Sequence, residues 1–371
     1  MPIHRGLTLK KFIHAIPLDL FERYLDQLQV VEKPSGWTLL HHKNLTAFLD
    51  DPRNADVSSI ILEEFHRIND LCGHGMSLLV RAYRRAGLDI DQDQPAEELA
   101  MRLFLDHRED FDCAWSLYLI YNNPSKLSVY RLPGPRIEVN PEHIDHLQSE
   151  LAGWFSGLAK GDACHVDWFV DGDDAVIRIS RGSYLRNIAC WQGDQVTFFR
   201  FRPATEDVIV YNPALSQLVI KASLPKDRAQ YLSAFATCIA GDAHLAEAAS
   251  EAPVFTLAPL QDGTFHFEGN GVVTGVSLVK VIAKLGDRYG TVMELRSDNI
   301  METLRRPPFK DLTLDAVELV AATFRFQLQP EGASQVSVTF EIEPPARTNL
   351  TQKQYADIIE RYLAEQGVRL L

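Results

Sequence analysis

The sequence has no long apolar run and no paired-cysteine motif. No stretch approaches the ~18–20 apolar residues that a membrane-spanning helix needs, and no signal-peptide core follows Lys10 and Lys11. The 5 cysteines, at positions 72, 113, 164, 190 and 238, include no C-x-x-C pair. An odd, unpatterned set is typical of reduced thiols rather than of a disulfide framework. These absences predict a cytoplasmic protein without a membrane segment.

The sequence also lacks the short motifs that identify common chemistries. It contains neither the G-x-S-x-G of a serine nucleophile nor a Walker A phosphate loop. No cofactor and no metal site are therefore predicted, and no catalytic signature is found.

Composition is that of an ordinary globular protein. The chain has 371 residues, of which 46% are hydrophobic and 23% charged, enough for two or three domains. The formal net charge of −13 argues against a general nucleic-acid coat, although it leaves room for a local basic patch.

The hydrophobic spacing changes along the chain and predicts an α+β protein of three domains. Residues 1–125 have apolar residues at helical spacing and form a predicted helical domain. Residues 126–250 and 251–371 each read as an antiparallel β-meander with helices, and the similar plan raises the hypothesis of an internal repeat.

The stretch 164–241 defines this architecture most clearly. Short runs rich in β-forming residues, separated by turn residues, predict a meander over 164–222. Pro225 then starts a predicted helix that Ser223 caps and Gly241 ends. In the last domain we expect strands at 254–260, 264–268, 276–285, 291–295, 317–329 and 335–342, and a C-terminal helix that begins with a capping box at Thr351 and Gln354.

Two basic sets are the candidate binding residues. Guanidinium groups interleaved with aromatic residues suit phosphates and exposed bases. The first set lies among Tyr184, Trp191 and Phe198, in a segment (164–202) with five Arg and five Asp; the second lies in 276–310, which has seven basic residues against four acidic ones. The candidates are Arg178, Arg181, Arg186, Arg200 and Arg202 in the first set, and Lys280, Lys284, Arg305 and Arg306 in the second.

Four residues are weak catalytic candidates. His165 and Asp167 point to the same side of a predicted strand, where a His–Asp pair can orient a general base. Asp207 and Lys221 invite comparison with metal-dependent nucleases of the PD-(D/E)xK type. Val219 stands where such an enzyme needs its second carboxylate, so a metal site is not predicted.

The sequence therefore favours a non-enzymatic intracellular binding or scaffold protein, a subunit of a larger assembly with protein partners. A nucleic-acid-associated role is a version of this interpretation, with the two basic sets as contacts. The alternatives are a hydrolase or metal-dependent nuclease with a degenerate or unrecognised site, and a component of a bacterial defence or mobile-element system, which gene neighbours would decide.

Overall fold

The computed structural model describes residues 9–28, 44–74, 76–90, 94–121, 126–192, 194–286, 288–309, 313–330, 334–350, 353 and 355–370. The chain divides into two compact units, Met1–Tyr118 and Leu119–Leu371. Its secondary structure is mixed α+β, as predicted: helices come first, and antiparallel sheets with helices follow.

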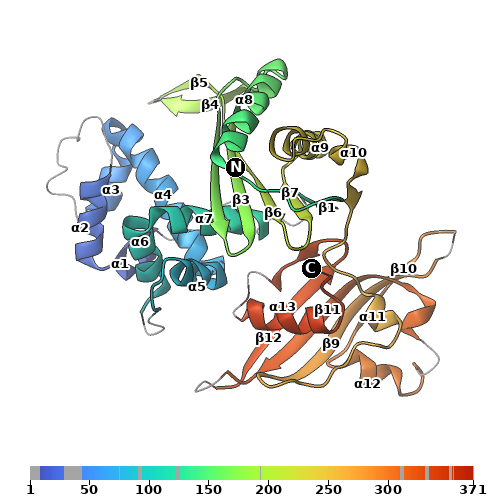
Figure 1. Ribbon diagram of the computed structural model, residues 1–371. Coiled ribbons are helices and arrows are strands. Elements are labelled where there is room, and N and C mark those ends of the chain that lie inside the picture. The colour runs from blue at the N-terminus through green and yellow to red at the C-terminus, as the bar shows by residue number, and fades with distance from the viewer. Residues whose placement is uncertain are drawn as a thin grey trace. The chain divides into compact units, whose positions relative to one another are not determined.

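The first unit is helical (Figure 1). Its helices are α1 (Leu9–Ala15), α2 (Leu18–Gln27), α3 (Leu45–Asp50), α4 (Ala55–His74), α5 (Met76–Arg85), α6 (Ala96–Asp106) and α7 (Arg108–Tyr121), the last of which runs into the second unit. Helices α6 and α7 are separate, because the backbone leaves the helical region at His107. Phe65 packs against Phe12 and Tyr24 inside this unit.

A six-stranded sheet with the order β2-β3-β6-β7-β1-β8 follows, and all its pairings are antiparallel. Its strands are β1 (Leu127–Arg131), β2 (Cys164–Asp171), β3 (Asp174–Gly182), β6 (Ala204–Asn212), β7 (Gln217–Lys221) and β8 (Ser250–Glu251). Helices α8 (Pro141–Gly157) and α9 (Pro225–Ala234), the π-helical turn η4 (Phe235–Ile239) and α10 (Leu245–Ala248) accompany this sheet.

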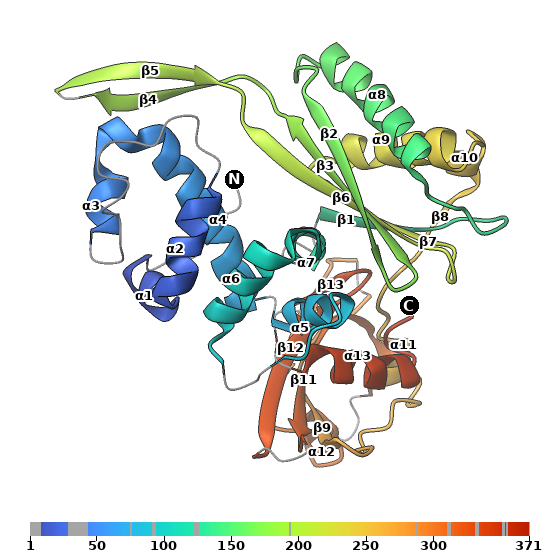
Figure 2. The same cartoon turned by 60° about the vertical axis from the view of Figure 1, so that its left-hand side comes forward.

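These helices cover one face of the sheet, as the two views show (Figures 1 and 2). Asn140 caps α8 by accepting a hydrogen bond from the backbone N–H of His143, and Pro141 occupies the first turn. The apolar side of α8, including Leu147 and Phe155, packs with the inward residues of β3 and β6. Leu224, not Ser223, is the N-cap of α9, so that predicted cap is wrong.

The expected continuous meander is interrupted. Strands β4 (Arg186–Gln192) and β5 (Gln195–Phe201) pair only with each other among the described residues, and β6 pairs directly with β3. The pairing of β3 with β6 extends to Gly182 opposite Ala204, so the β4–β5 hairpin leaves the sheet at that point. Both views show the hairpin projecting from the sheet, and we call residues 184–201 the arm (Figures 1 and 2).

The last part of the chain forms a five-stranded antiparallel sheet with the order β10-β9-β11-β12-β13. Its elements are β9 (Val273–Lys284), β10 (Val292–Arg296), β11 (Glu318–Leu328), β12 (Val336–Glu343), β13 (Arg347–Thr348), α11 (Ala258–Gln261), α12 (Ile300–Leu304) and α13 (Ala356–Glu365). Phe324, Phe326 and Phe340 line the inner face, and Tyr362 of α13 packs on Phe326 with perpendicular rings. The predicted capping box of α13 lies outside the described residues.

Two strands expected here are wrong. The 254–260 segment turns into α11, because Thr256 Oγ1 accepts from the backbone N–H of Ala258 and Pro259 stands in the first turn. The 264–268 segment forms no strand, and one backbone hydrogen bond, from the N–H of Val276 to the carbonyl of Phe267, links it to β9. Side chains of the C-terminal helix region take its backbone groups instead: Tyr362 donates to the carbonyls of His266 and Glu268.

Candidate functional site

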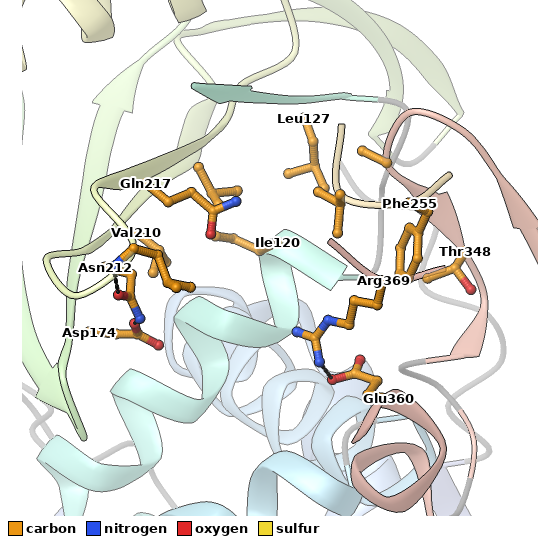
Figure 3. Close-up of a pocket in the computed structure, with 14 residues that line it drawn as sticks. Ile120, Leu127, Asp174, Val210, Asn212, Gln217, Phe255, Thr348, Glu360 and Arg369 are labelled. Atoms are coloured by element: carbon orange, nitrogen blue, oxygen red, sulfur yellow. Dashed lines mark hydrogen bonds and ion pairs between the residues drawn. The ribbon is translucent and has the colours of Figure 1, made fainter. Parts of the chain in front are cut away.

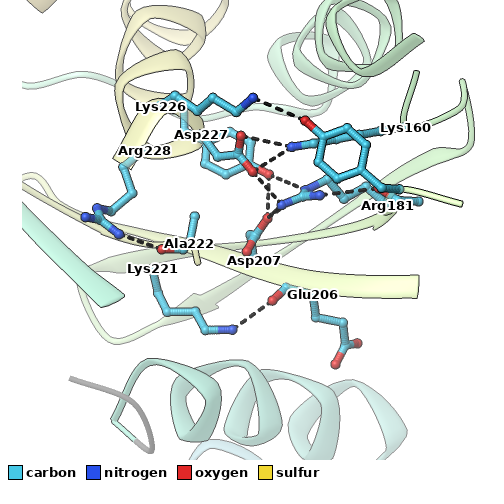
Figure 4. Close-up of polar contacts among 12 residues, drawn as sticks. Lys160, Arg181, Glu206, Asp207, Lys221, Ala222, Lys226, Asp227 and Arg228 are labelled. Atoms are coloured by element: carbon cyan, nitrogen blue, oxygen red, sulfur yellow. Dashed lines mark hydrogen bonds and ion pairs between the residues drawn. The ribbon is translucent and has the colours of Figure 1, made fainter. Parts of the chain in front are cut away.

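A cluster of charged side chains lies between the six-stranded sheet and its helices (Figure 4). Five side chains, which we call the ionic cluster, compose it: Lys160, Arg181, Asp207, Asp227 and Tyr231. Three elements supply four of them, β3 (Arg181), β6 (Asp207) and α9 (Asp227 and Tyr231), and Lys160 follows the end of α8. The cluster therefore joins every layer of this domain.

Arg181 is the hub of the ionic cluster. Its Nε donates to Asp207 Oδ2 at 2.8 Å and its Nη2 donates to Asp227 Oδ2 at 2.8 Å. Lys160 Nζ contacts both oxygens of Asp227, at 3.0 and 2.8 Å. The hydroxyl of Tyr231 donates to Asp207 Oδ2 at 2.7 Å. Two cations thus face two carboxylates, so the cluster is formally neutral.

The ionic cluster is closed to solvent. Asp207 and Asp227 are 0% exposed and Lys160 is 1% exposed. Burial raises the pKa of Tyr231 well above its ordinary value, and the nearby Asp207 carboxylate raises it further, so the phenol remains a donor. Burial lowers the pKa of Arg181, but Asp207, Tyr231 and Asp227 outweigh it and the net shift is upward. Because these side chains are buried and paired with one another, we interpret the ionic cluster as holding β3, β6 and α9 in place rather than as binding a substrate.

Removing one carboxylate tests this positioning role. In Asp227→Ala, Lys160 and Arg181 remain buried without that partner, and we expect the sheet to lose about 3–5 kcal/mol of stability. Hydrogen exchange of the β3 and β6 amides measures the opening free energy of this sheet separately from the rest of the chain. The control is Asp145→Ala on the exposed side of α8, which should change it by less than about 0.5 kcal/mol. A loss below about 1 kcal/mol in Asp227→Ala would contradict the role.

The ionic cluster continues into the root of the arm. The ring of Tyr184 lies 5.5 Å from Lys160 Nζ, alongside the rings of Trp154 and Phe155 at 5.4 Å each. Arg202 Nη1 donates to the carbonyls of Ala159 and Ser183, at 2.6 and 2.9 Å. The two ends of the arm are therefore tied to the turn after α8.

Gly182 allows this close approach. A Cβ there would stand 2.4 Å from the carbonyl oxygen of Lys160 and 2.9 Å from Cδ of Arg202. The first of these is backbone, which cannot move aside alone. Only a residue without a side chain fits where β3 turns into the arm.

We therefore expect Gly182→Ala to destabilise the sheet by about 1–3 kcal/mol, the usual cost of overpacking, in the same exchange measurement. Gly153→Ala is the matched control. Nothing lies within 4 Å of a Cβ at Gly153, an exposed position on helix α8, so alanine should stabilise by up to about 1 kcal/mol. Equal effects of the two substitutions would show that the contact with Lys160 does not matter.

The arm itself is covered by large exposed side chains. Trp191, Phe198 and Phe199 are 76%, 75% and 66% exposed, and Ile188 and Val196 are exposed as well. Paired residues of a hairpin point to the same side, so the register assigns each one to a face. The Trp191 face comprises Trp191, Val196, Ala189 and Phe198, and the Phe199 face comprises Phe199, Ile188, Cys190 and Thr197. Both faces of the arm are therefore apolar.

The first basic set is divided by the structure. Arg178 pairs with Asp167 at 2.8 Å, Arg181 lies in the ionic cluster, and Arg202 holds the arm root. Arg186 and Arg200 stand exposed on the arm. Within the described part of the chain, neither of these two guanidinium groups makes a hydrogen bond or an ion pair.

The second basic set lies on the C-terminal sheet and its helix α12. Lys280 pairs with Glu341 beside an open groove of about 620 Å³, and Lys284 pairs with Glu318 at 3.3 Å. Arg305 pairs with Glu302 at 2.6 Å, and Arg306 is exposed. Lys280, Lys284 and Arg305 thus each have a carboxylate partner.

The four catalytic candidates do not come together. His165 Nε2 lies 3.0 Å from Asp167 Oδ1, so the predicted pair forms. Asp207 points to the helix-covered face, whereas Lys221 points to the opposite face and donates to the carbonyl of Glu206 at 2.8 Å (Figure 4). Lys221 and Asp167 share a face but are three strands apart, about 14 Å at the usual strand spacing.

A pocket of about 160 Å³ lies within the second unit (Figure 3). Four of its polar side chains form two pairs: Asn212 donates to Asp174 at 2.7 Å, and Arg369 contacts Glu360. Much of the remaining lining is apolar, including Phe255. The pocket is therefore largely apolar, with these two polar pairs in its wall.

Neither a metal-binding group nor a membrane-spanning helix is found in the described ranges of the chain. Within them, no group of three or more His, Cys, Asp and Glu side chains is placed to hold a metal ion. No helix there is long and apolar enough to cross a bilayer.

Sequence reasoning missed Lys160, Asp227 and Tyr231, because their partners lie 24 to 67 residues away along the chain. It also missed the two-faced arm. One signal was present: the adjacent residues Phe198 and Phe199 place an aromatic ring on each side of any strand. No protein-family model matches the chain, and no curated protein matches it.

Proposed function

We propose that the protein is a non-enzymatic, intracellular subunit of a larger assembly and that it binds a protein partner through the arm. The observation that carries this proposal is the apolar surface on both faces of the β4–β5 hairpin. The five cysteines are free thiols in the structure, which suits the reducing cytoplasm.

The exposed apolar area of the arm is large for a free surface. Aromatic side chains bury about 150–250 Å² each, so the three exposed rings present on the order of 400 Å². The two faces together thus expose an area comparable with the largest apolar patch of a typical monomer, about 300–600 Å², and such exposed apolar area commonly marks interaction sites. It is also about half of the roughly 800 Å² that each partner contributes to a standard interface.

The contacts within the arm alone give it little stability. A lone two-stranded hairpin is marginally stable in water, and this one packs neither face on the rest of its domain. Burial against a partner would stabilise it by about 25 cal/mol per Å² of apolar surface. The root of the arm is held in place and its two apolar faces are exposed. Both features favour binding of another molecule that buries these faces.

The nucleic-acid version of this proposal has less support. Of the first basic set, Arg178 and Arg181 are buried in ion pairs and Arg202 holds the root, which leaves Arg186 and Arg200 for phosphates. The enzymatic alternative has no specific geometry in its favour, since Asp207 and Lys221 point to opposite faces of the sheet.

Purification of the tagged protein from its native host, with and without nuclease, tests the proposal. We expect a stoichiometric protein partner that survives nuclease and that is lost from the W191S/F198S/F199S variant. Removing hot-spot aromatic residues costs about 2 kcal/mol or more each, which is roughly a 30-fold loss of affinity per residue.

The matched control is L285S/Y289S/V292S, which removes three exposed apolar residues from the β9–β10 turn of the C-terminal sheet. This variant should keep the partner. Binding that is lost equally in both variants, or that disappears with nuclease, would contradict a protein contact through the arm.

A further inference from the structure

We infer that the partner is a different polypeptide that encloses the arm in a slot, with apolar walls against both faces and carboxylates at its mouth. This inference rests on the proposed function and specifies the chemistry of the partner. The decisive observation is that apolar side chains stand on both sides of the hairpin at adjacent positions along it.

Two cross-strand pairs show this arrangement. Ala189 pairs with Phe198 on the Trp191 face, and the adjacent pair, Ile188 with Phe199, lies on the opposite face. Docking on a flat surface would bury one of these pairs and leave the other in water. A slot that covers both faces buries all three exposed aromatic rings and brings the interface toward the roughly 800 Å² per partner of a standard complex.

A second copy of the chain does not meet this requirement. Two arms stacked face to face form a two-fold contact that covers one face of each and leaves the other exposed. Each copy also has a formal net charge of −13, so long-range repulsion opposes their approach.

A lipid bilayer is not a suitable environment for the arm either. In the described structure the hairpin is a separate two-stranded sheet, so each strand has an outer edge with no strand beside it. Its backbone N–H and C=O groups would have no hydrogen-bond partner in hydrocarbon, at a cost of several kcal/mol each. A polypeptide slot can supply backbone groups along these edges.

The charges of the arm identify the mouth of the slot. Arg186 pairs with Phe201 and Arg200 with Asn187, so one guanidinium stands on each face at the root end of the arm. Asp194 is at the tip, which gives the arm two positive charges and one negative charge. When the arm enters tip first, the two guanidinium groups stop at the rim, where carboxylates of the partner would pair with them.

Site-specific photo-cross-linking of the full chain in its native host tests the slot. The photoreactive residue p-benzoylphenylalanine replaces Trp191 in one variant and Phe199 in another, one on each face. We expect both positions to cross-link the same polypeptide, through different peptides of it. The control position is Tyr289, which is 74% exposed on another turn and should give no such product.

The cross-linked polypeptide, once purified, is then the binding probe. W191S/F198S and I188S/F199S should each weaken its binding by about 30-fold or more, because each face has its own wall. R186E/R200E should weaken it by about tenfold, with the difference shrinking at high salt.

The remaining outcomes separate the inference from the proposed function. A cross-link from only one face, or to two different proteins, overturns the slot and leaves an arm that binds proteins. A cross-link to a second copy of the chain overturns the inferred partner. Products with nucleic acid or lipid alone, or no product at either position, overturn both the slot and the protein-binding role.

Discussion

The guanidinium of Arg181, held between Asp207 and Asp227, is the interaction on which the rest of this domain depends. It ties the neighbouring strands β3 and β6 to helix α9, which follows β7 in the sequence. Buried ion pairs add little net stability over well-packed apolar residues, because both charges lose their hydration. Here even one carboxylate atom, Asp207 Oδ1, is buried without a hydrogen-bond partner among the described residues. What the cluster supplies is geometry: a planar group with fixed donors allows only one placement of α9 over β3 and β6.

The residues that follow Arg181 connect the ionic cluster directly to the root of the arm at the surface. Arg181 is followed by Gly182, whose missing side chain lets the strand lie against the carbonyl of Lys160. Lys160 is itself a member of the cluster, and Arg202 closes the same turn from the other strand. The arm thus has a rigid base and an uncovered body. Such a combination reduces the conformational entropy that a binding element loses when it docks.

Sequence periodicity was sufficient for the class of fold and for most strands, because alternation and turn residues are local signals. The central strands of both sheets and the helix after Pro225 lie close to where they were expected. The failures have non-local causes. Segment 264–268 has β-forming residues, but the hydroxyl of Tyr362, almost a hundred residues away, donates to two of its carbonyls, those of His266 and Glu268. The ionic cluster is likewise assembled by pairings that no local pattern encodes.

The register of the sheet has a consequence for how this protein can change. Because β3 and β6 remain paired up to Gly182 and Ala204, the 21 residues from 183 to 203 form an excursion between two neighbouring positions of one hairpin. A short turn could join those two positions without altering a single pairing in the six-stranded sheet. The excursion is therefore a separable module. Its length and side chains can vary, or be exchanged for another sequence, while the sheet that presents it keeps its core.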